Sequence, residues 1–493
     1  MNSKATSPGS PAQHTALRTG SLGVTAIVFF VVATVGPMSA LIGGIPLAFA
    51  LGPGTGVPGL FLFVAALLIL FSVGYTAMSR HVVDVGGFYV YIGSAFGRRA
   101  QQAAGLVALF SYHTMILALW ALLSLITSAF IHEAAGWNVS WIVVMLAGLA
   151  LVGVLGRRDV NLSAGVLGVL MLAEVAVIAV MDVAVFLQTP ASGFTAAPFE
   201  LGHIFQGDVG AGFMFCVVVF IGFEATAIYS EEAKDPRRTI PRAAYVSVGV
   251  IALFHIVSSW ALVLAYGTDH VQNAALGDMT NFVYAVADNS LGGTFVVVMK
   301  VLFVTSTFAA CLGVHNAVSR YQFSLAREGI LPRKLAQTHP KWMSPHHSSL
   351  AQTVIAMVVI LAFHLAGVAP TTIFSLLLAM GTFGLIVLMG ALCFAVMYFF
   401  GRDHRGENWW VRLAAPLIAG AGFTTVIVLL LKNWDVQTGS SAWFAAYLPW
   451  LVPVLAVIGF FLPGSAAGLG RRQADPPVGL AADQPQDTKV EAP

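Results

Sequence analysis

The sequence predicts an all-α polytopic membrane protein with about 12 transmembrane helices. Three observations support this fold class. Hydrophobic residue types make up 58% of the 493 residues and charged types only 9%, whereas a soluble domain carries roughly 25% charged residues. Apolar runs long enough to cross a bilayer recur along the chain. Lys and Arg residues gather in alternate connections between these runs.

Each predicted span holds the roughly 20 predominantly apolar residues that a bilayer core requires, except the fourth, which is short. The third and eighth spans are long enough to tilt or to extend into water. The polar segments 1–20 and 464–493 are predicted to be disordered, and the first of them lacks the pattern of a secretory signal. The spans cover residues 22–50, 57–79, 101–130, 140–156, 163–187, 209–230, 243–267, 293–325, 348–368, 372–399, 411–432 and 444–463.

The positions of the basic residues predict the orientation of these spans. All of the 24 Lys and Arg residues except Lys300 and Lys432 fall on one side of the predicted membrane, whereas the opposite loops carry acids such as Glu133 and Asp269. Basic residues are retained on the cytoplasmic side of membrane proteins. We therefore expect a multi-pass protein of the cell membrane with both termini in the cytoplasm.

The composition also argues against several other classes of protein. A net charge of +2 is too small to indicate a nucleic-acid partner. Cys216, Cys311 and Cys393 each lie within an apolar run, so they are predicted to be free thiols. No HExxH, GxSxG or Walker-type motif occurs. We therefore expect neither an enzyme nor a cofactor or metal site, and we expect no direct use of ATP.

Two spans contain helix-breaking residues near mid-membrane. Residues 31–40 read VVATVGPMSA, in which Gly36 and Pro37 disfavour a continuous helix. Residues 218–227 read VVFIGFEATA, with Gly222 and the acidic Glu224 at the matching place. Interrupted helices at corresponding points of two halves indicate a transport site, although Gly and Pro also kink tightly packed membrane helices.

These breaks lie five spans apart, which predicts two inverted five-helix repeats followed by two further helices. The predicted boundaries place the first repeat in residues 21–200 and the second in residues 201–400. The two further helices then occupy residues 401–463.

Four segments resemble the amino acid–polyamine–organocation (APC) superfamily, in particular bacterial amino acid permeases. The most specific is FIGFE at 220–224 followed by EEAKDPRRTIPRA at 231–243. The others are VGGFYVYI at 85–92, SR at 319–320 with AREGILP at 326–332, and the interrupted first span. The resemblance covers about residues 20–465. It implies a leucine-transporter-like fold and a secondary active transporter that works by alternating access.

The resemblance also implies that the solute, an amino acid or a related amine, is held where the first and sixth helices are interrupted. Free N–H groups at helix N-termini can bind a carboxylate, and carbonyls at helix C-termini can bind an amine. The implied substrate-binding residues are Thr34, Val35, Gly36, Pro37, Met38, Tyr112, His113, Phe220, Ile221, Gly222, Phe223, Glu224, Val314 and His315.

The chain departs from the family pattern at two places. Members that bind amino acid carboxylates usually carry a Gly-Ser-Gly-like run in the first helix, where this chain has Gly36, Pro37 and Met38. Pro37 lacks an N–H group, which weakens or shifts carboxylate recognition. In the fifth helix, Glu174 takes the place where many bacterial members have a lysine. Both departures favour a carboxylate-free amine or polyamine as the alternative substrate.

Ionisable residues inside membrane spans are costly and commonly functional. Glu174, Asp182, Glu224 and Lys300 are such residues. Because burial disfavours the charged form of a carboxyl group, Glu224 and Glu174 are the candidates for proton coupling. The alternatives are a structural hydrogen-bonding role for the two glutamates, access to water for Asp182, and, for Lys300, either snorkelling to the membrane surface or pairing with an acid.

The sequence therefore favours a proton-coupled transporter or exchanger for an amino acid or amine, with protons, the solute and the lipid bilayer as its partners. A different class is a solute sensor that binds without transporting, and the lack of a sizeable soluble output domain argues against it.

Overall fold

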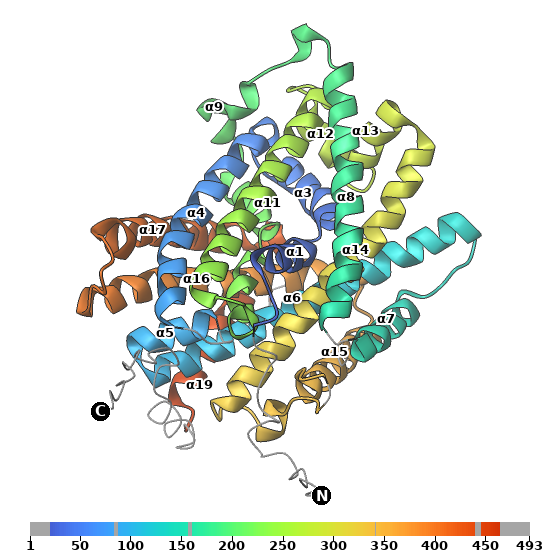
Figure 1. Cartoon of the computed structure of the whole chain (residues 1–493). Helices are drawn as coiled ribbons and strands as arrows, with labels where there is room; N and C mark the ends of the chain where they lie inside the picture. Colours follow the sequence, from blue (N-terminus) through green and yellow to red (C-terminus); the bar gives the residue numbers. More distant parts are fainter. Residues whose placement is uncertain (1–19, 83–86, 156–159, 341, 439–444, 464–493) are drawn as a thin grey trace, which may run out of the picture.

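The computed structural model describes residues 20–82, 87–155, 160–340, 342–438 and 445–463. The predicted disordered segments 1–20 and 464–493 lie outside these residues, apart from Gly20. The described chain is helical, with a single isolated backbone bridge between Leu22 and Ala233. The predicted all-α polytopic fold is thereby confirmed (Figure 1).

Within the described residues, ten helical segments are long and apolar enough to cross a membrane, and two shorter apolar helices accompany them. These twelve segments correspond in order to the predicted spans. The first half contains α1 (Val24–Val35), α2 (Pro37–Ser39), η2 (Ala40–Gly44), α3 (Ile45–Leu51), η3 (Gly54–Gly56), α4 (Val57–His81), α5 (Phe88–Phe96), α6 (Arg98–Ala135), α7 (Trp141–Leu155) and α8 (Val160–Gln188).

The second half begins after the short connecting helices η4 (Ala191–Gly193), η5 (Ala197–Phe199) and α9 (Leu201–Ile204). It contains α10 (Val209–Val218), η6 (Phe223–Glu232), α11 (Pro236–Tyr266), α12 (Val271–Gly277), α13 (Phe282–Leu291), α14 (Gly293–Arg327), η7 (Arg333–Ala336), α15 (His346–Leu365) and α16 (Pro370–Arg402). The last elements are η8 (Trp410–Ala414), α17 (Ala415–Lys432), α18 (Trp434–Thr438), η9 (Ala445–Trp450) and α19 (Leu451–Phe461).

The interrupted first span lies inside the bundle. Helix α1 packs against α8, α11 and α14, and Figure 1 shows it near the centre of the view, with α11 and α8 on either side. Helices α7 and α15 pack against each other farther out. The two interrupted spans are the most buried of the ten, at 72% and 89% of their apolar windows. The breaks predicted from sequence therefore lie where the backbone groups that they free are surrounded by protein and not by lipid.

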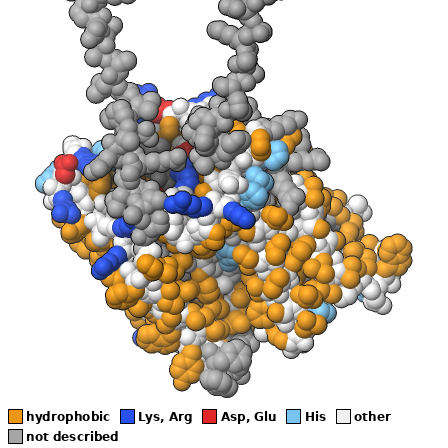
Figure 2. All heavy atoms as spheres, turned by 90° about the horizontal axis from the view of Figure 1, so that it is seen from below, with side chains coloured by type: hydrophobic (Ala, Val, Ile, Leu, Met, Phe, Trp, Pro, Cys, Tyr) orange, Lys and Arg blue, Asp and Glu red, His pale blue; other side chains and the backbone are white. Residues whose placement is uncertain are grey.

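The outer surface is apolar, as expected for contact with lipid. Large side chains such as Leu187, Leu253, Val358 and Leu365 are more than 60% exposed, which a soluble protein would not tolerate over many helices. Figure 2 shows Lys and Arg side chains gathered on one part of the face seen from below, beside a wide hydrophobic area.

Lys300, a basic residue within a span, has a charged partner and an aromatic partner in the structure. Its Nζ lies 2.7 Å from both carboxylate oxygens of Glu133, at the far end of α6. The ammonium also lies 5.5 Å from the ring centre of Tyr284. Of the alternatives drawn from sequence, pairing with an acid is therefore the one that the structure shows.

Close packing of α1 against α14 depends on Gly313. A Cβ added there would collide with the Thr34 hydroxyl and lie 3.1 Å from the Thr34 Cα. We expect Gly313→Ala to destabilise the protein by about 1–3 kcal/mol, the usual effect of overpacking. Thermal unfolding in detergent measures this loss of stability. Gly249→Ala on α11 is the control, because nothing lies within 4 Å of its added Cβ, and an equal loss in both variants would contradict the prediction.

Candidate substrate site

The first span is broken at Gly36. Helix α1 ends at Val35, and Gly36 has φ +66°, a left-handed conformation that glycine adopts without a Cβ clash. Pro37 then begins α2 at the first helical position, where its missing N–H is tolerated. A π-helical turn over Ala40–Gly44 follows, a distortion that is frequent at functional sites.

The sixth span is broken at Gly222, which has φ +123°. Helix α10 ends at Val218, and the chain resumes as a ten-residue 3-10 helix, η6. Runs of 3-10 helix this long are uncommon because their hydrogen bonds are poorly aligned. The interruption predicted within the span 209–230 is therefore present, and it separates two segments of different helical type.

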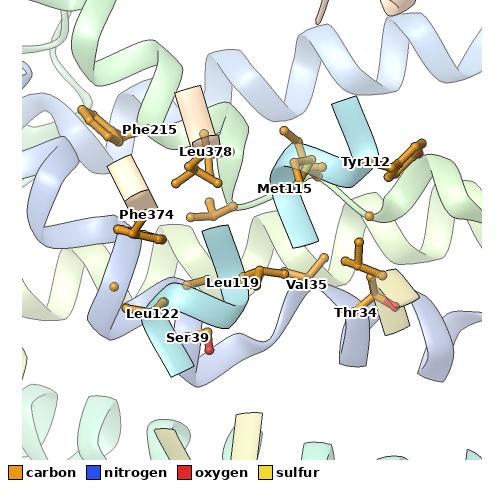
Figure 3. Close-up of a pocket in the computed structure, with 18 of the residues that line it drawn as sticks. Thr34, Val35, Ser39, Tyr112, Met115, Leu119, Leu122, Phe215, Phe374 and Leu378 are labelled. Carbon is orange, nitrogen blue, oxygen red and sulfur yellow. The ribbon is translucent and has the colours of Figure 1, made fainter. Parts of the chain in front are cut away.

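Residues of both interrupted segments line the same cavity. A Cβ added at Gly222 would lie 3.4 Å from side-chain atoms of Thr34 and Val35, so the two interrupted segments are in contact. Figure 3 shows labelled side chains from α1, α6, α10 and α16 around this space. The cavity is lined by Thr34, Val35, Ser39, Ala40, Gly43, Gly44, Leu47, Tyr112, Met115, Leu119, Leu122, Phe215, Val218, Val219, Ile221, Gly222, Ala225, Val314, Ala317, Phe374 and Leu378.

The carboxyl group of Glu224 joins the sixth-span break to α6. Tyr112 Oη donates to Glu224 Oε1 at 2.7 Å, and the Gly222 N–H donates to Oε2 at 2.8 Å. Tyr75 Oη donates to the Glu224 backbone carbonyl at 2.9 Å. Tyr112 and Gly222 line the cavity while Glu224 lies directly behind them. A change in its protonation would therefore act on two cavity residues at once.

Glu174 from α8 occupies the equivalent place at the first-span break. Its Oε2 accepts the Met38 N–H at 3.3 Å, and the Ser306 hydroxyl is also hydrogen bonded to its carboxyl group. The Ser306 Oγ in turn accepts the Ser39 N–H at 3.3 Å. A carboxyl group at a helix N-terminus is electrostatically favourable. Glu174 and Ser306 therefore cap the helix that begins at Pro37.

Six of the substrate-binding residues inferred from sequence line the cavity: Thr34, Val35, Tyr112, Ile221, Gly222 and Val314. The other eight, which do not line it, are Gly36, Pro37, Met38, His113, Phe220, Phe223, Glu224 and His315. Glu174, inferred only for proton coupling, also lies outside the lining.

The two histidines point elsewhere because successive residues of an α-helix are rotated by about 100°. Tyr112 and Val314 face the cavity, and His113 and His315 are each turned away from it by this rotation. His113 lies within hydrogen-bonding distance of the Leu109 carbonyl and Gln322. His315 is bonded instead to the Ser349 hydroxyl on α15, with 2.8 Å between Nε2 and Oγ.

Sequence reasoning missed most of the apolar lining. Met115, Leu119 and Leu122 follow Tyr112 at spacings of three, four and three, which is one face of a helix. That periodicity was a usable signal once Tyr112 had been placed. Phe374 and Leu378 on α16 carried no comparable signal, because only the packing of α16 against α6 brings them there.

A group of ion pairs lies at the other end of η6. Arg320 on α14 donates from Nε and Nη2 to the two carboxylate oxygens of Glu232 at 2.9 and 3.0 Å, and both side chains are buried. Arg327 pairs with Glu231 at 2.6 Å. We call these four residues the clasp.

The clasp also holds the start of the described chain. Backbone N–H groups of Ser21 and Leu22 both donate to the Glu232 carbonyl at 2.9 Å, and the Lys234 N–H donates to the Leu22 carbonyl at 2.9 Å. The segment before α1, the end of η6 and the end of α14 are thereby joined. The start of the segment 231–243, which resembles the permease family in sequence, is thus tied to two other elements.

The fold and the cavity together define a multi-pass membrane protein with a cavity between two interrupted helices. A family model for amino acid permeases matches residues 20–460. The chain therefore belongs to the amino acid permease family of the APC superfamily, and it is a membrane transporter rather than an enzyme. The resemblance noted in the sequence is confirmed.

Individual relatives are distant. The chain is similar to the low-affinity putrescine importer PlaP of Escherichia coli (strain K12), at 22% identity over 62% of this chain and 67% of the relative. It is 26% identical to an uncharacterised transporter of Rhizobium meliloti (strain 1021) over 85% of each chain. It is 29% identical to the mouse Asc-type amino acid transporter 1, but over 32% of this chain and 27% of the relative.

Proposed function

We propose that this permease moves an amino acid or a related amine by alternating access, and that the movement is coupled to protons. The observation that carries the proposal is the buried Glu224 carboxyl group, bonded to Tyr112 and Gly222 behind the cavity. Proton binding at Glu224 would alter both bonds, and therefore the wall of the solute cavity. Glu174, bonded to the first-span break, is the second candidate for coupling.

Alternating access requires one end of the cavity to close while the other opens. We propose that the clasp closes the cytoplasmic end, because the bias of basic residues assigns that side to the cytoplasm. We also propose that residues 21–200 and 201–400 are the two inverted repeats that move relative to each other. The matched breaks at Gly36 and Gly222 support this division.

Uptake of labelled amino acids and amines into proteoliposomes tests the proposal. If transport is coupled to protons, the solute should accumulate in the vesicles when the outside is more acidic than the inside. Without such a gradient, the solute should only equilibrate. A complete failure to take up or exchange any such solute would contradict transport of this solute class. Saturable binding without uptake would instead support the alternative of a solute sensor.

Among the possible solutes, the geometry favours an amine without a carboxylate. At the first-span break, the Gly36 N–H donates to the Val32 carbonyl, Pro37 has no N–H, and the next two N–H groups are bonded to Glu174 and Ser306. At the other break the Gly222 N–H is bonded to Glu224. The donors that would hold a carboxylate are therefore engaged within the protein.

We expect amines to compete for uptake better than the amino acids from which they differ by a carboxyl group. Putrescine should inhibit uptake at lower concentrations than ornithine, and tyramine at lower concentrations than tyrosine. Displacing the Glu174 and Ser306 bonds for a carboxylate would cost about 1–3 kcal/mol, so we expect a difference of about fivefold or more. Inhibition constants for each amine and its amino acid measure this difference. Equal or tighter inhibition by the amino acids would overturn the preference for amines.

A further inference from the structure

The cavity between the two interrupted helices has two chemically different ends. Figure 3 shows Thr34 and Tyr112 on one side of it, and Leu122, Phe215 and Phe374 on the other. Tyr112 and Leu122 are ten residues apart on α6, which separates them by about 15 Å along the helix axis. We call the side with Thr34 and Tyr112 the break end, and the side with Leu122, Phe215 and Phe374 the far end.

The break end offers hydrogen-bond acceptors for one ammonium group. Thr34 and Val35 form the end of α1 and line the cavity. The two N–H groups that would continue this helix, those of Met38 and Ser39, are bonded to side chains instead. The Thr34 and Val35 carbonyls therefore accept no hydrogen bond from the described backbone. Carbonyls at a helix C-terminus favour a cation, so the proposed function places the solute amine at this end.

The cavity has no acidic group for a second positive charge. Among the described residues that line it, none is Asp, Glu, Lys, Arg or His. Its three side-chain hydroxyl groups, on Thr34, Ser39 and Tyr112, are each hydrogen bonded within the protein. A second ammonium group at the far end would thus lose its water without gaining a charged partner, which is strongly unfavourable.

The far end suits a hydrocarbon group. It is formed by Phe215 on α10, Leu122 on α6, and Phe374 with Leu378 one turn later on α16. Transfer of methyl and methylene groups from water to such a wall is favourable. A solute that matches both ends therefore carries one ammonium group and an apolar tail.

The volume of the cavity indicates a small solute. The cavity measures about 70 Å³, which is room for about five to seven water molecules at 10–15 Å³ each. Pentylamine and putrescine each have six non-hydrogen atoms, which is a comparable number. They have the same chain length and differ at one end, where pentylamine has a methyl group and putrescine has a second ammonium group.

We propose that the far end makes this permease selective for small primary monoamines with an apolar tail, and that it excludes diamines. Leu122, Phe215 and Phe374 are the residues that determine this specificity. The inference rests on the proposed transport of amines through this cavity, and it adds which amines are accepted.

Direct binding of labelled pentylamine and labelled putrescine to the purified full-length protein in detergent tests the proposal. We expect saturable binding of pentylamine and a dissociation constant for putrescine at least about a hundredfold higher, because the second charge is buried without a partner. 1-Pentanol, which lacks the ammonium group, should displace pentylamine at least about tenfold more weakly than unlabelled pentylamine does.

A variant with a carboxylate at the far end should reverse the preference. Phe374→Glu supplies a partner for the second ammonium group, so we expect the ratio of the putrescine and pentylamine dissociation constants to fall at least about tenfold. Thr372→Glu is the matched control. It adds the same charge to an exposed position of the same helix that does not line the cavity, and it should leave the ratio unchanged.

Several outcomes would overturn the proposal. Putrescine binding to the wild type as tightly as pentylamine would do so without any variant, and therefore whether or not Phe374→Glu folds. An unchanged ratio in a Phe374→Glu protein that still binds amine, or an equal change in Thr372→Glu, would remove the role of the far end. Uptake of other solutes without pentylamine binding would overturn this inference alone. If no amine or amino acid is bound or taken up, the proposed function fails with it.

Discussion

Replacing Arg320 by Gln is expected to lower the stability of the protein by about 3–5 kcal/mol, because the change leaves the Glu232 carboxylate buried without its partner. Arg320 and Glu232 side chains are 1% and 7% exposed, and the guanidinium also lies 5.0 Å from the ring centre of Tyr229. The measurement is thermal and denaturant unfolding in detergent.

The second ion pair of the clasp supplies a matched control. Arg327 and Glu231 join the same two elements, but their side chains are 24% and 22% exposed. Partly solvated pairs contribute about 0–1 kcal/mol, so Arg327→Gln should have a small effect. Restored stability in the double variant Arg320→Gln, Glu232→Gln would show that the unpaired charge causes the loss. Equal losses for Arg320→Gln and Arg327→Gln would contradict the argument.

Replacing Glu224 by Gln is expected to abolish accumulation driven by a pH gradient while leaving solute binding intact. Gln has nearly the same shape; its single amide oxygen can accept the Gly222 N–H while its NH2 group donates to the Tyr112 oxygen, but it cannot bind and release a proton. For one proton per solute, each pH unit supplies about 1.4 kcal/mol, or a tenfold accumulation ratio. We therefore expect the tenfold gain per pH unit in the wild type and no gain in the variant.

Tyr112→Phe separates the carboxyl group from its hydrogen-bond donor. This variant removes the hydroxyl that bonds Glu224 Oε1 and keeps the group that titrates. It should retain a pH-dependent accumulation with a reduced rate. If Glu224→Gln still accumulates solute in proportion to the gradient, coupling does not pass through Glu224, and Glu174 becomes the remaining candidate.

Sequence patterns predicted most of the spans and their breaks because the bilayer limits the possible structures. A spanning segment must satisfy its own backbone, so long apolar runs in this chain can only be helices. The breaks were equally accessible, since Gly36 and Pro37 disfavour a helix for local reasons, and Gly222 stands at the matching place. Buried acids were visible for the same reason: Glu174, Asp182 and Glu224 stand out in runs that otherwise hold no charge.

The direction in which each side chain points could not be predicted from the sequence. Tyr112 and His113 are neighbours in sequence, yet only Tyr112 faces the cavity. The partner of each buried acid was also hidden, because Glu174 meets Met38 across 136 residues and Glu224 meets Tyr112 across 112. Contacts of that range depend on how helices are rotated and tilted against one another.

The sequence by itself determined that the chain crosses a membrane about 12 times, that its first and sixth spans are interrupted, and to which family it belongs. These properties depend on local hydropathy, backbone preferences and short motifs. Tertiary structure alone decided that the helix beginning at Pro37 is capped by Glu174 and Ser306, and that Asp182 and His255 line one cavity between α1, α8 and α11. The physical reason is that helix packing, not helix formation, sets which face of each span turns toward its neighbours.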